Sequence, residues 1–423
     1  MKNISLETLA VHGSYKKDET GATNPPIYLS NAYQFKDGEH AAALFDLSTS
    51  GYIYTRLNNP TVAVLEETVA ALEGGIAALA CSSGQFAEFM TIITLAKQGD
   101  NIVTSNLLYG GTHTLFTSQF ARFGIEFRFA DPNNIAEFEK LIDDKTKAIY
   151  IESVANPQGV VPDFKAFAEL ANKHKLPLVV DNTCATPYLV RPIEQGAHIV
   201  IHSATKFLSG HGNVLGGIVV DSGKFDWENS GRFNEFSTPD ESYHGLVFTK
   251  HFGAACFAAK MRVSAMRDIG GCISPFNAFL IQTGIATLHV RMQRHIENAK
   301  KLAAYLKTNQ FVEWVNYNGL EDNKNYKMAS TYLKDNGASI LTFGVKGGYE
   351  KSKKFIEKVR LALHVSNLGD IKTIVTHPAS TTHRQVPQDE LESTGITANL
   401  IRVSVGIENI DDIIEDFKNA LED

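Results

Sequence analysis

The sequence has few cysteines, no long apolar run and no basic tract, and each absence excludes a class of protein. Its four cysteines show neither paired nor metal-ligand spacing, so we expect reduced, buried thiols at Cys81, Cys184, Cys256 and Cys272. No run approaches the roughly 18 apolar residues of a membrane span, and residues 1–8 lack the apolar core of a secretory signal. We therefore expect a cytoplasmic protein that does not bind a membrane.

Charge gives no indication of a nucleic-acid partner. The formal net charge is −7 over 423 residues, and no basic patch is interleaved with aromatic side chains. With 43% hydrophobic residues the chain can bury a large core, and its length predicts two or more domains. Composition therefore agrees with an ordinary metabolic enzyme without identifying one.

The order of hydrophobic patterns predicts an α/β fold. Residues 1–60 are turn-rich and poor in strands, which is typical of an arm laid over another surface. Between residues 61 and 262 apolar strand patterns alternate with helical ones, as in a mostly parallel sheet covered by helices. Residues 263–423 lead through a long helical stretch into a smaller C-terminal α+β domain. We expect strands at 102–104, 148–151, 178–180, 198–201, 218–220, 340–343 and 400–405, and helices at 86–93, 166–173, 277–306 and 408–423.

A lysine stands where ligands of a parallel sheet bind. The tetrapeptide Ser203-Ala204-Thr205-Lys206 follows the apolar run 197–201, and such sheets bind ligands outside the carboxyl ends of their strands. The two hydroxyls can hold a phosphate while the amine bonds to a carbonyl carbon, and pyridoxal phosphate needs both. The tetrapeptide alone is more often a solvated strand end, so the neighbouring strands decide the interpretation.

Two further strand patterns end in carboxylates. Asp181 follows the apolar run 178–180, and a carboxylate there can pair with a protonated pyridine nitrogen. Glu152 ends the run 148–151 and is followed shortly by Asn156. An aspartate in a turn after a strand is common in itself. Three polar strand ends at one edge of a sheet nevertheless favour a functional site over three unrelated turns.

The segment Ser83-Gly84-Gln85 is a candidate for the phosphate side of this site. It precedes a helical pattern, and the free N–H groups at a helix start can point at an anion. A plain strand-to-helix turn would have the same sequence. The glycine-rich stretch 210–217 is not a dinucleotide-binding motif, because Leu215 occupies the third glycine position and a strand pattern follows where a helix is required.

Taken together, these motifs resemble the Cys/Met-metabolism pyridoxal-phosphate enzymes, a family of the aspartate aminotransferase fold type (fold type I). The resemblance covers almost the whole chain and implies pyridoxal 5'-phosphate as the cofactor. It rests on Tyr54-Thr55-Arg56 with Asn59-Pro60-Thr61, Ser83-Gly84-Gln85, Leu108-Tyr109-Gly110-Gly111-Thr112, Glu152 with Asn156-Pro157, Asp181-Asn182-Thr183, Ser203-Ala204-Thr205-Lys206 and Arg402-Val403-Ser404-Val405-Gly406.

The resemblance implies a role for each of these residues. Lys206 would bond to the cofactor and then act as a base, Asp181 would hold the ring nitrogen, and Tyr109 would stack on the ring. The other cofactor contacts within the chain would come from Ser83, Gly84, Gln85, Glu152, Asn156, Ser203 and Thr205. Tyr54 and Arg56 would reach the phosphate of a neighbouring subunit, which implies a homotetramer built from dimers with shared active sites. The substrate carboxylate would be bound by Arg402, with Asn156, Ser366 and Tyr54 nearby.

Within the family, four further segments are similar to the sulfhydrylase branch: 239–245, 274–279, 366–370 and 376–383. The expected reaction is therefore replacement of acetate in O-acetyl-L-homoserine by sulfide or methanethiol. Side chains alone do not reveal which acyl ester and which sulfur donor are used.

Three alternatives stay open. Methionine γ-lyase activity and cystathionine γ-synthase or γ-lyase activity would use the same site, although Gly111 stands where such lyases often carry cysteine. A non-catalytic regulatory homologue belongs to another class, and the intact Lys206, Asp181 and Tyr109 disfavour it. We expect no metal site, because no acidic partner stands at ligand spacing from His202, His211, His377 and His383.

Overall fold

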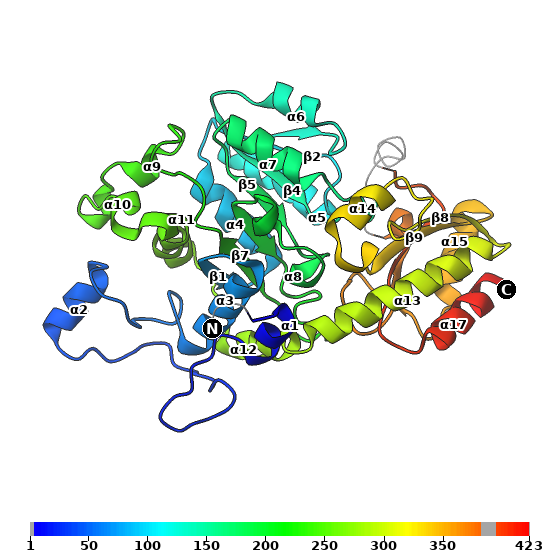
Figure 1. Cartoon of the computed structure of the whole chain (residues 1–423), viewed down its shortest axis with the longest axis horizontal. Helices are drawn as coiled ribbons and strands as arrows, with labels where there is room; N and C mark the ends of the chain where they lie inside the picture. Colours follow the sequence, from blue (N-terminus) through cyan, green and yellow to red (C-terminus); the bar gives the residue numbers. More distant parts are fainter. Residues whose placement is uncertain (1–3, 382–394, 423) are drawn as a thin grey trace.

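The computed structural model describes residues 4–381 and 395–422, and its main element is a seven-stranded sheet (Figure 1). The parallel strands are β2 (Asn101–Ser105), β3 (Glu126–Ala130), β4 (Thr146–Glu152), β5 (Leu178–Asp181) and β6 (Ile199–His202). The order is β1-β7-β6-β5-β4-β2-β3, in which β7 (Gly217–Asp221) is antiparallel to both β6 and β1 (Ala77–Cys81). The prediction of a mostly parallel sheet is confirmed.

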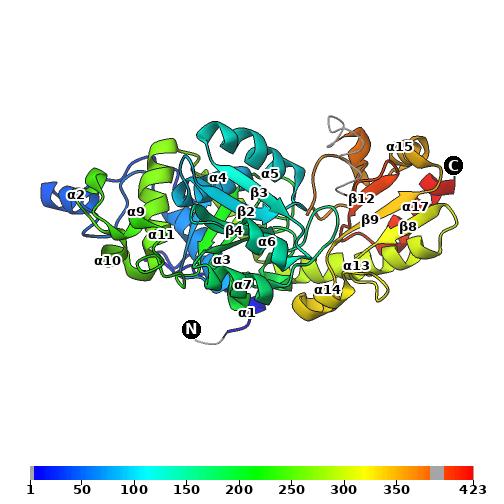
Figure 2. The ribbon, with the colours of Figure 1, turned by 90° about the horizontal axis from the view of Figure 1, so that it is seen from above.

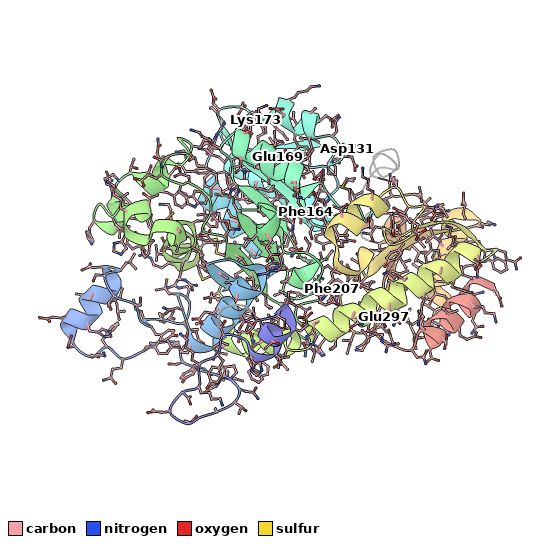
Figure 3. All side chains as sticks on the ribbon, in the orientation of Figure 1. Asp131, Phe164, Glu169, Lys173, Phe207 and Glu297 are labelled. Atoms are coloured by element: carbon pink, nitrogen blue, oxygen red, sulfur yellow. The ribbon has the colours of Figure 1, made fainter. Side chains whose placement is uncertain are left out.

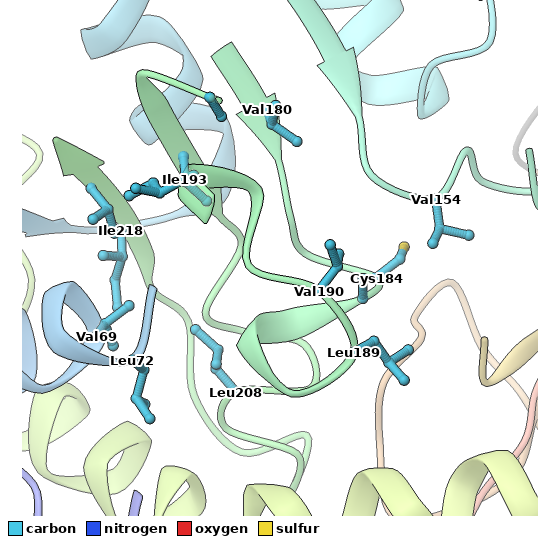
Figure 4. Packing of buried hydrophobic residues seen from close by; sticks show 14 of the residues in the cluster. Val69, Leu72, Val154, Val180, Cys184, Leu189, Val190, Ile193, Leu208 and Ile218 are labelled. Carbon is cyan, nitrogen blue, oxygen red and sulfur yellow. The ribbon is translucent and has the colours of Figure 1, made fainter. Parts of the chain in front are cut away.

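Successive strand residues pack on opposite faces of this sheet, as the two-residue period of a strand requires. Val200 joins a cluster built with α3 (Pro60–Glu73), α7 (Phe164–Lys173) and α12 (Pro275–Ile285), and Figure 4 shows Ile218 of β7 and Val69 of α3 in that cluster. Ile199 and Ile201 join a second cluster with α4 (Gly84–Leu95) and α11 (Cys256–Lys260). Because both faces are covered, the central strands are continuous apolar runs.

Two strands of this sheet were not expected from the sequence. β1 consists of the small residues Ala-Ala-Leu-Ala-Cys, which have little strand propensity. β3 lies at the edge of the sheet and alternates charged with aromatic residues. The expected helices 86–93 and 166–173 are present as α4 and α7. Three shorter helices connect strands, α5 (Gly110–Thr114), α6 (Ile135–Leu141) and α8 (Thr186–Leu189), and two more follow β7, α9 (Asn234–Ser237) and α10 (Phe248–Phe252).

A second sheet of five strands has the order β10-β11-β12-β9-β8 and lies at the right of Figure 1. Its strands are β8 (Val312–Asn316), β9 (Ile340–Val345), β10 (Leu363–His364), β11 (Ile374–Thr376) and β12 (Leu400–Ser404). The helices around it are α13 (Leu288–Thr308), α14 (Tyr326–Tyr332), α15 (Gly348–Lys358) and α17 (Ile410–Glu422). Among the described residues, no helix is both long and apolar enough to cross a membrane.

The long helix expected at 277–306 is two helices. α12 ends at Ile285 and α13 begins at Leu288, so the chain breaks at residues 286–287. α12 packs on α3, a helix that covers the larger sheet, whereas α13 packs on β8 and β9 of the smaller sheet (Figures 1 and 2). The sequence pattern showed the helical period on both sides of the break but not the break itself.

One face of α13 binds both parts of the molecule through polar side chains. Arg291 donates to the carbonyl oxygens of Phe207 at 2.8 Å and Leu208 at 3.2 Å. His295 Nδ1 donates to Val405 O at 2.6 Å, and its ring meets the Phe207 ring edge-to-face near the position labelled in Figure 3. Asn298 Nδ2 donates to Gly406 O at 3.0 Å. The spacing i, i+4, i+7 places these three side chains on one side of the helix.

The described part of the arm, residues 4–60, contains two short helices, α1 (Leu6–His12) and α2 (Gly38–Phe45). α1 packs on α3 of its own chain, whereas α2 lies at the end of the molecule opposite the smaller sheet (Figures 1 and 2). Several large apolar side chains of this part are exposed, most of all Leu29 by 75% and Phe45 by 61%. We propose a division into an arm (1–60), a larger domain (61–262) and a smaller domain (263–423).

A buried cluster ties the ends of β5 and β6 to α3. Glu73 Oε1 accepts a hydrogen bond from Asn182 Nδ2 at 2.7 Å and lies 2.7 Å from His202 Nε2. None of the three side chains is exposed. Asn182 directly follows Asp181, and His202 directly precedes Ser203. Glu73 therefore fixes the two strand ends that carry the candidate site.

We expect Glu73→Ala to lower the free energy of unfolding by about 3 kcal/mol or more, because two buried polar groups lose their partner. Urea denaturation measures the change. Glu67→Ala is the matched control, since Glu67 lies on the exposed side of the same helix, and it should change the stability by less than about 0.5 kcal/mol. A Glu73 variant as stable as the control would contradict the role given to this cluster.

Candidate active site

A cavity of about 210 Å³ lies at the carboxyl ends of β4, β5 and β6. Residues 366–368 and Arg402 close it from the smaller sheet. It brings together most of the residues expected from the sequence: Ser83, Gly84, Gln85, Tyr109, Glu152, Asn156, Asp181, Ser203, Thr205, Lys206, Ser366 and Arg402.

Parallel strand register brings these side chains to one edge. Glu152 is paired with Asp181 across β4 and β5, and Asp181 with Ile201 across β5 and β6. Beyond the strands, the N–H of Ser203 donates to Thr183 Oγ1 at 2.7 Å and joins the two loops that leave β5 and β6. The polar strand ends therefore face one space.

The first turn of α4 lies at the same edge. Ser83 caps the helix, because its Oγ accepts the N–H of Phe86 at 3.1 Å. Glycine is required at position 84, since a Cβ atom there would lie 2.6 Å from Ser203 Cβ. The first N–H groups of a helix have no acceptor within it, so Gly84 and Gln85 can donate to an anion in the cavity.

Lys206 enters the cavity from the turn after β6. Its Nζ donates to Asn367 Oδ1 at 2.6 Å. Burial, together with the positive charge of Arg402, lowers the pKa of the amine from 10.5 to about 8. A larger fraction of the amine is therefore neutral near pH 7 than in an ordinary lysine, which makes it a better nucleophile and base.

Three carboxyl groups line the cavity, and burial raises the pKa of each. Asp181 Oδ1 accepts the N–H of Thr183 at 2.8 Å. Glu152 accepts the backbone N–H of Tyr109 at 2.6 Å, and the charge of Asp181 further raises its pKa. Burial and then Asp181 raise the pKa of Glu88 to about 8. Carboxylates this close disfavour one another's charge, so a cation bound beside Asp181 would be strongly stabilised.

Arg402 comes from β12 and is almost fully buried, with 7% of its surface exposed. Its Nη2 donates to Asn367 O at 2.6 Å and to Thr376 Oγ1 at 3.1 Å, and its Nη1 donates to Asn156 Oδ1 at 3.4 Å. All three partners are neutral, and within residues 4–381 and 395–422 its Nε has no partner. A buried guanidinium without an anion is suited to bind a carboxylate. The predicted segment 376–383 reaches this site through Thr376, while Thr382 and His383 lie outside the described residues.

A second cavity of about 490 Å³ adjoins the first and shares Gln85, Tyr109, Asn156, Ser366 and Arg402 with it. We call it the vestibule. Tyr109 is 45% exposed and lies at the boundary of the two spaces. The rest of its described lining is uncharged: Gly110, Gly111, Thr114, Leu115, Gln119, Pro157 and Pro378.

The sequence predicted no role in the site for several residues of the first cavity, although Thr183 and the segment 366–370 belong to motifs that carry the family resemblance: Glu88, Val154, Thr183, Cys184, Leu215, Asn367 and Leu368. Thr183 and Cys184 lie two and three residues after Asp181, so closeness in the sequence could have found them. Glu88 lies one turn after Gly84 on α4, where it accepts hydrogen bonds from Thr112 at 2.7 Å and Tyr150 at 3.0 Å. Only the tertiary structure places Asn367 beside Lys206.

Tyr54 and Arg56 do not line either cavity of their own chain. Both are exposed, and the Arg56 guanidinium lies 5.5 Å from the centre of the Tyr54 ring. Their predicted contact with the cofactor concerns a neighbouring subunit. The assignment stays a prediction.

The fold and this lysine-centred cavity define a pyridoxal-phosphate enzyme of the aspartate aminotransferase fold type. The chain belongs to the family of Cys/Met metabolism PLP-dependent enzymes, whose family model matches residues 7–422. It is 50% identical over 423 residues to the homocysteine synthase of Schizosaccharomyces pombe, with 99% of this chain and 98% of that protein covered. It is 47% identical over 431 residues to the O-acetyl-L-homoserine sulfhydrylase of Leptospira meyeri, with 99% and 97% covered.

A solved structure has nearly the same fold as this chain. The metY protein of Campylobacter jejuni, provisionally assigned as an O-acetylhomoserine (thiol)-lyase, superposes with a TM-score of 0.97 at 40% identity, with 99% of this chain and 100% of that chain covered. One lysine of that protein is present as N'-pyridoxyl-lysine-5'-monophosphate.

The residues of the cavity fit pyridoxal phosphate. Lys206 offers a partly neutral amine for the aldehyde, and Asp181 offers a buried carboxylate for the ring nitrogen. Ser203, Thr205 and the start of α4 offer hydroxyl and N–H groups for the phosphate. The donor set thus matches the three polar ends of the cofactor.

We expect Asp181→Asn to lower turnover by about 100-fold or more, because a neutral amide cannot hold the ring nitrogen protonated by charge. The cofactor should still attach, so borohydride reduction should leave the label on Lys206. Steady-state assays and peptide mapping after reduction measure the two outcomes.

Lys206→Ala is the control for attachment and should carry no label after the same reduction. Turnover of Asp181→Asn within about fivefold of the parent would mean that another group pairs with the ring nitrogen.

Proposed function

We propose that the protein is an O-acetyl-L-homoserine sulfhydrylase. It replaces the acetate of O-acetyl-L-homoserine by sulfide or methanethiol and gives homocysteine or methionine. The observation that carries the proposal is the identity of 50% and 47%, over 99% of the chain, to a homocysteine synthase and an O-acetyl-L-homoserine sulfhydrylase. The site supports it, because one cavity holds a buried guanidinium without an anion and an amine of lowered pKa.

Each residue performs a step that its surroundings favour. Arg402 binds the α-carboxylate, since its described partners are all neutral. Lys206 takes the α-proton and carries protons along the substrate carbon chain, for which its lowered pKa suits it. Asp181 would hold the ring nitrogen protonated, and Tyr109 would stack on the ring and assist at the leaving-group side. Bound pyridoxal phosphate supplies the sink for the electrons released at the α-carbon.

The vestibule supports a small uncharged acyl group and a small sulfur nucleophile. Arg402 is the one charged residue of its described lining. In the proposed complex its guanidinium pairs with the carboxylate of the substrate. A succinyl or phosphoryl ester would bring an additional negative charge into this space, where burial without a counter-charge is costly. Acetate is also a better leaving group than hydroxide, which favours the acetyl ester over free homoserine.

With O-acetylhomoserine and sulfide we expect homocysteine in about tenfold or greater excess over α-ketobutyrate, because we propose that the vestibule of the bound complex admits the sulfur nucleophile and excludes water. Methionine alone should be a poor substrate. Chromatographic quantification of both products tests the proposal, with O-succinyl- and O-phosphohomoserine as matched substrates that should react more slowly.

Release of α-ketobutyrate from methionine as fast as homocysteine is formed would favour a γ-lyase instead. Formation of cystathionine from cysteine at a comparable rate would favour a cystathionine γ-synthase. A protein that does not bind pyridoxal phosphate would favour a regulatory role.

We further propose a cytoplasmic homotetramer built from dimers with shared active sites. Support comes from the arm, where Tyr54 and Arg56 are exposed and remote from the cavity of their own chain. In a dimer these residues complete the phosphate site of the neighbouring subunit. A monomer is then nearly inactive.

Mixing an Arg56→Ala chain with a Lys206→Ala chain, each inactive alone, should restore about a quarter of the parent activity, because half of the randomly formed dimers contain one intact site of two. Activity after demonstrated subunit exchange measures this. The control pairs Lys206→Ala with Asp181→Asn; both residues belong to the same chain's site, so no intact site arises. Equal activity in the two mixtures would place Arg56 outside a shared site.

A further inference from the structure

Asn367 contacts both cationic groups of the active site. Its side-chain Oδ1 accepts a hydrogen bond from Lys206 Nζ at 2.6 Å. Its main-chain oxygen accepts one from Arg402 Nη2, also at 2.6 Å. The amine follows a strand of the larger sheet and the guanidinium comes from a strand of the smaller sheet. This single residue therefore contacts a functional group from each of the two parts of the molecule.

The segment around Asn367 is held from both sides. The N–H of Gly369 donates to Ser404 Oγ at 2.9 Å, which fixes the segment to β12. On the other side, a Cβ atom at position 369 would lie 2.7 Å from the backbone nitrogen of Phe207, so the chain passes close to the turn that carries Lys206. Leu368 is buried between these contacts. The position of Asn367 relative to Lys206 is therefore set by packing and not by one hydrogen bond.

The neutrality of Asn367 has a chemical reason. The titratable side chains that share the cavity with Lys206 come from five places in the chain. They are Arg402 of β12, Asp181 at the end of β5 with Cys184 after it, Glu152 of β4, Glu88 of α4 and Tyr109 before α5. An uncharged oxygen can orient the amine without favouring its protonated form. A carboxylate at the same place would stabilise the ammonium form and would offset the charge of Arg402.

We propose that Asn367 is a positioning residue that couples substrate recognition to proton transfer. Its main-chain oxygen orients Arg402 for the substrate carboxylate, and its side-chain oxygen orients the Lys206 amine once the amine is free to act as a base. One residue thereby aligns the two groups that bind and deprotonate the same amino acid. The inference rests on the proposed function only in that the substrate is an amino acid.

Three variants separate the parts of this proposal. Asn367→Asp keeps the shape and adds a charge. Asn367→Ala removes the side-chain oxygen and keeps the main-chain oxygen that Arg402 uses. Asn409→Asp is the matched control, because Asn409 is exposed in the same domain and an aspartate there can still accept the N–H of Asp411.

The first measurement is the pH titration of the visible absorption of the cofactor bound to Lys206, which needs no turnover. Asn367→Asp should raise the pKa of the Lys206 nitrogen, and hence the midpoint of the transition, by about one pH unit or more. Asn409→Asp should leave it within about 0.2 units of the parent. A midpoint unchanged in Asn367→Asp would overturn the proposal.

The second measurement is exchange of the α-hydrogen of L-norvaline in deuterium oxide, followed by proton NMR. Asn367→Ala should lower the exchange rate at saturation by about tenfold or more, while half-saturation changes by less than about threefold. Asn367→Ser, which returns a hydroxyl acceptor, should recover part of the rate. Weaker norvaline binding at an unchanged rate would overturn the proposal, because the side-chain oxygen would then act on Arg402.

Norvaline has no leaving group, so exchange is independent of the acyl ester and the sulfur donor. Failure to form homocysteine would overturn the proposed function alone. Normal exchange in Asn367→Ala would overturn the coupling alone.

Discussion

The parallel register of β4, β5 and β6 is the constraint on which the rest of the structure depends. Parallel strands end at the same edge, so residues that follow them meet whatever their distance in the sequence. Here the register pairs Glu152 with Asp181 and brings the turn with Lys206 beside them. A slip of one residue in β5 would turn Asp181 to the other face of the sheet, and the cavity would lose its central carboxylate.

The register also creates an electrostatic problem, because it buries carboxyl groups together without a cationic partner in the described part of the chain. Three buried carboxyl groups, Asp181, Glu152 and Glu88, line one cavity, where burial raises the pKa of each and the charge of Asp181 further raises the pKa of Glu152 and of Glu88. Arg402 and Lys206 enter from β12 and from the turn after β6 and keep neutral partners. Anionic and cationic groups are thus both available for a ligand with charges of both signs, such as a cofactor with an amino-acid substrate. Separation of these charges, rather than their mutual pairing, gives the site its chemistry.

Residues that follow a strand pattern were predictable from the sequence. The apolar runs before Glu152, Asp181 and Ser203 predicted the three strands, because a strand buried on both faces consists almost entirely of apolar residues. The polar residues that end these runs predicted the edge of the sheet at which the site lies. Residues whose position depends on a distant segment were not predictable. Asn367 reaches Lys206 only through the packing of Gly369 on the Lys206 turn, and Glu88 occupies a helix position that reads as surface or core equally well. β1 was missed because its small residues pack well only when β7 lies beside them.

The three polar contacts of α13 have a consequence for how this chain can vary. Arg291 holds the turn after Lys206, while His295 and Asn298 hold the chain that leaves β12 just after Arg402. The helix α13 therefore sets the distance between the Lys206 amine and the Arg402 guanidinium. An insertion of a single residue between Arg291 and His295 would rotate one end of this helix by about 100° relative to the other. The number of residues between Arg291 and His295 is therefore constrained by the active site at both ends of the helix, in addition to the packing of its buried apolar face.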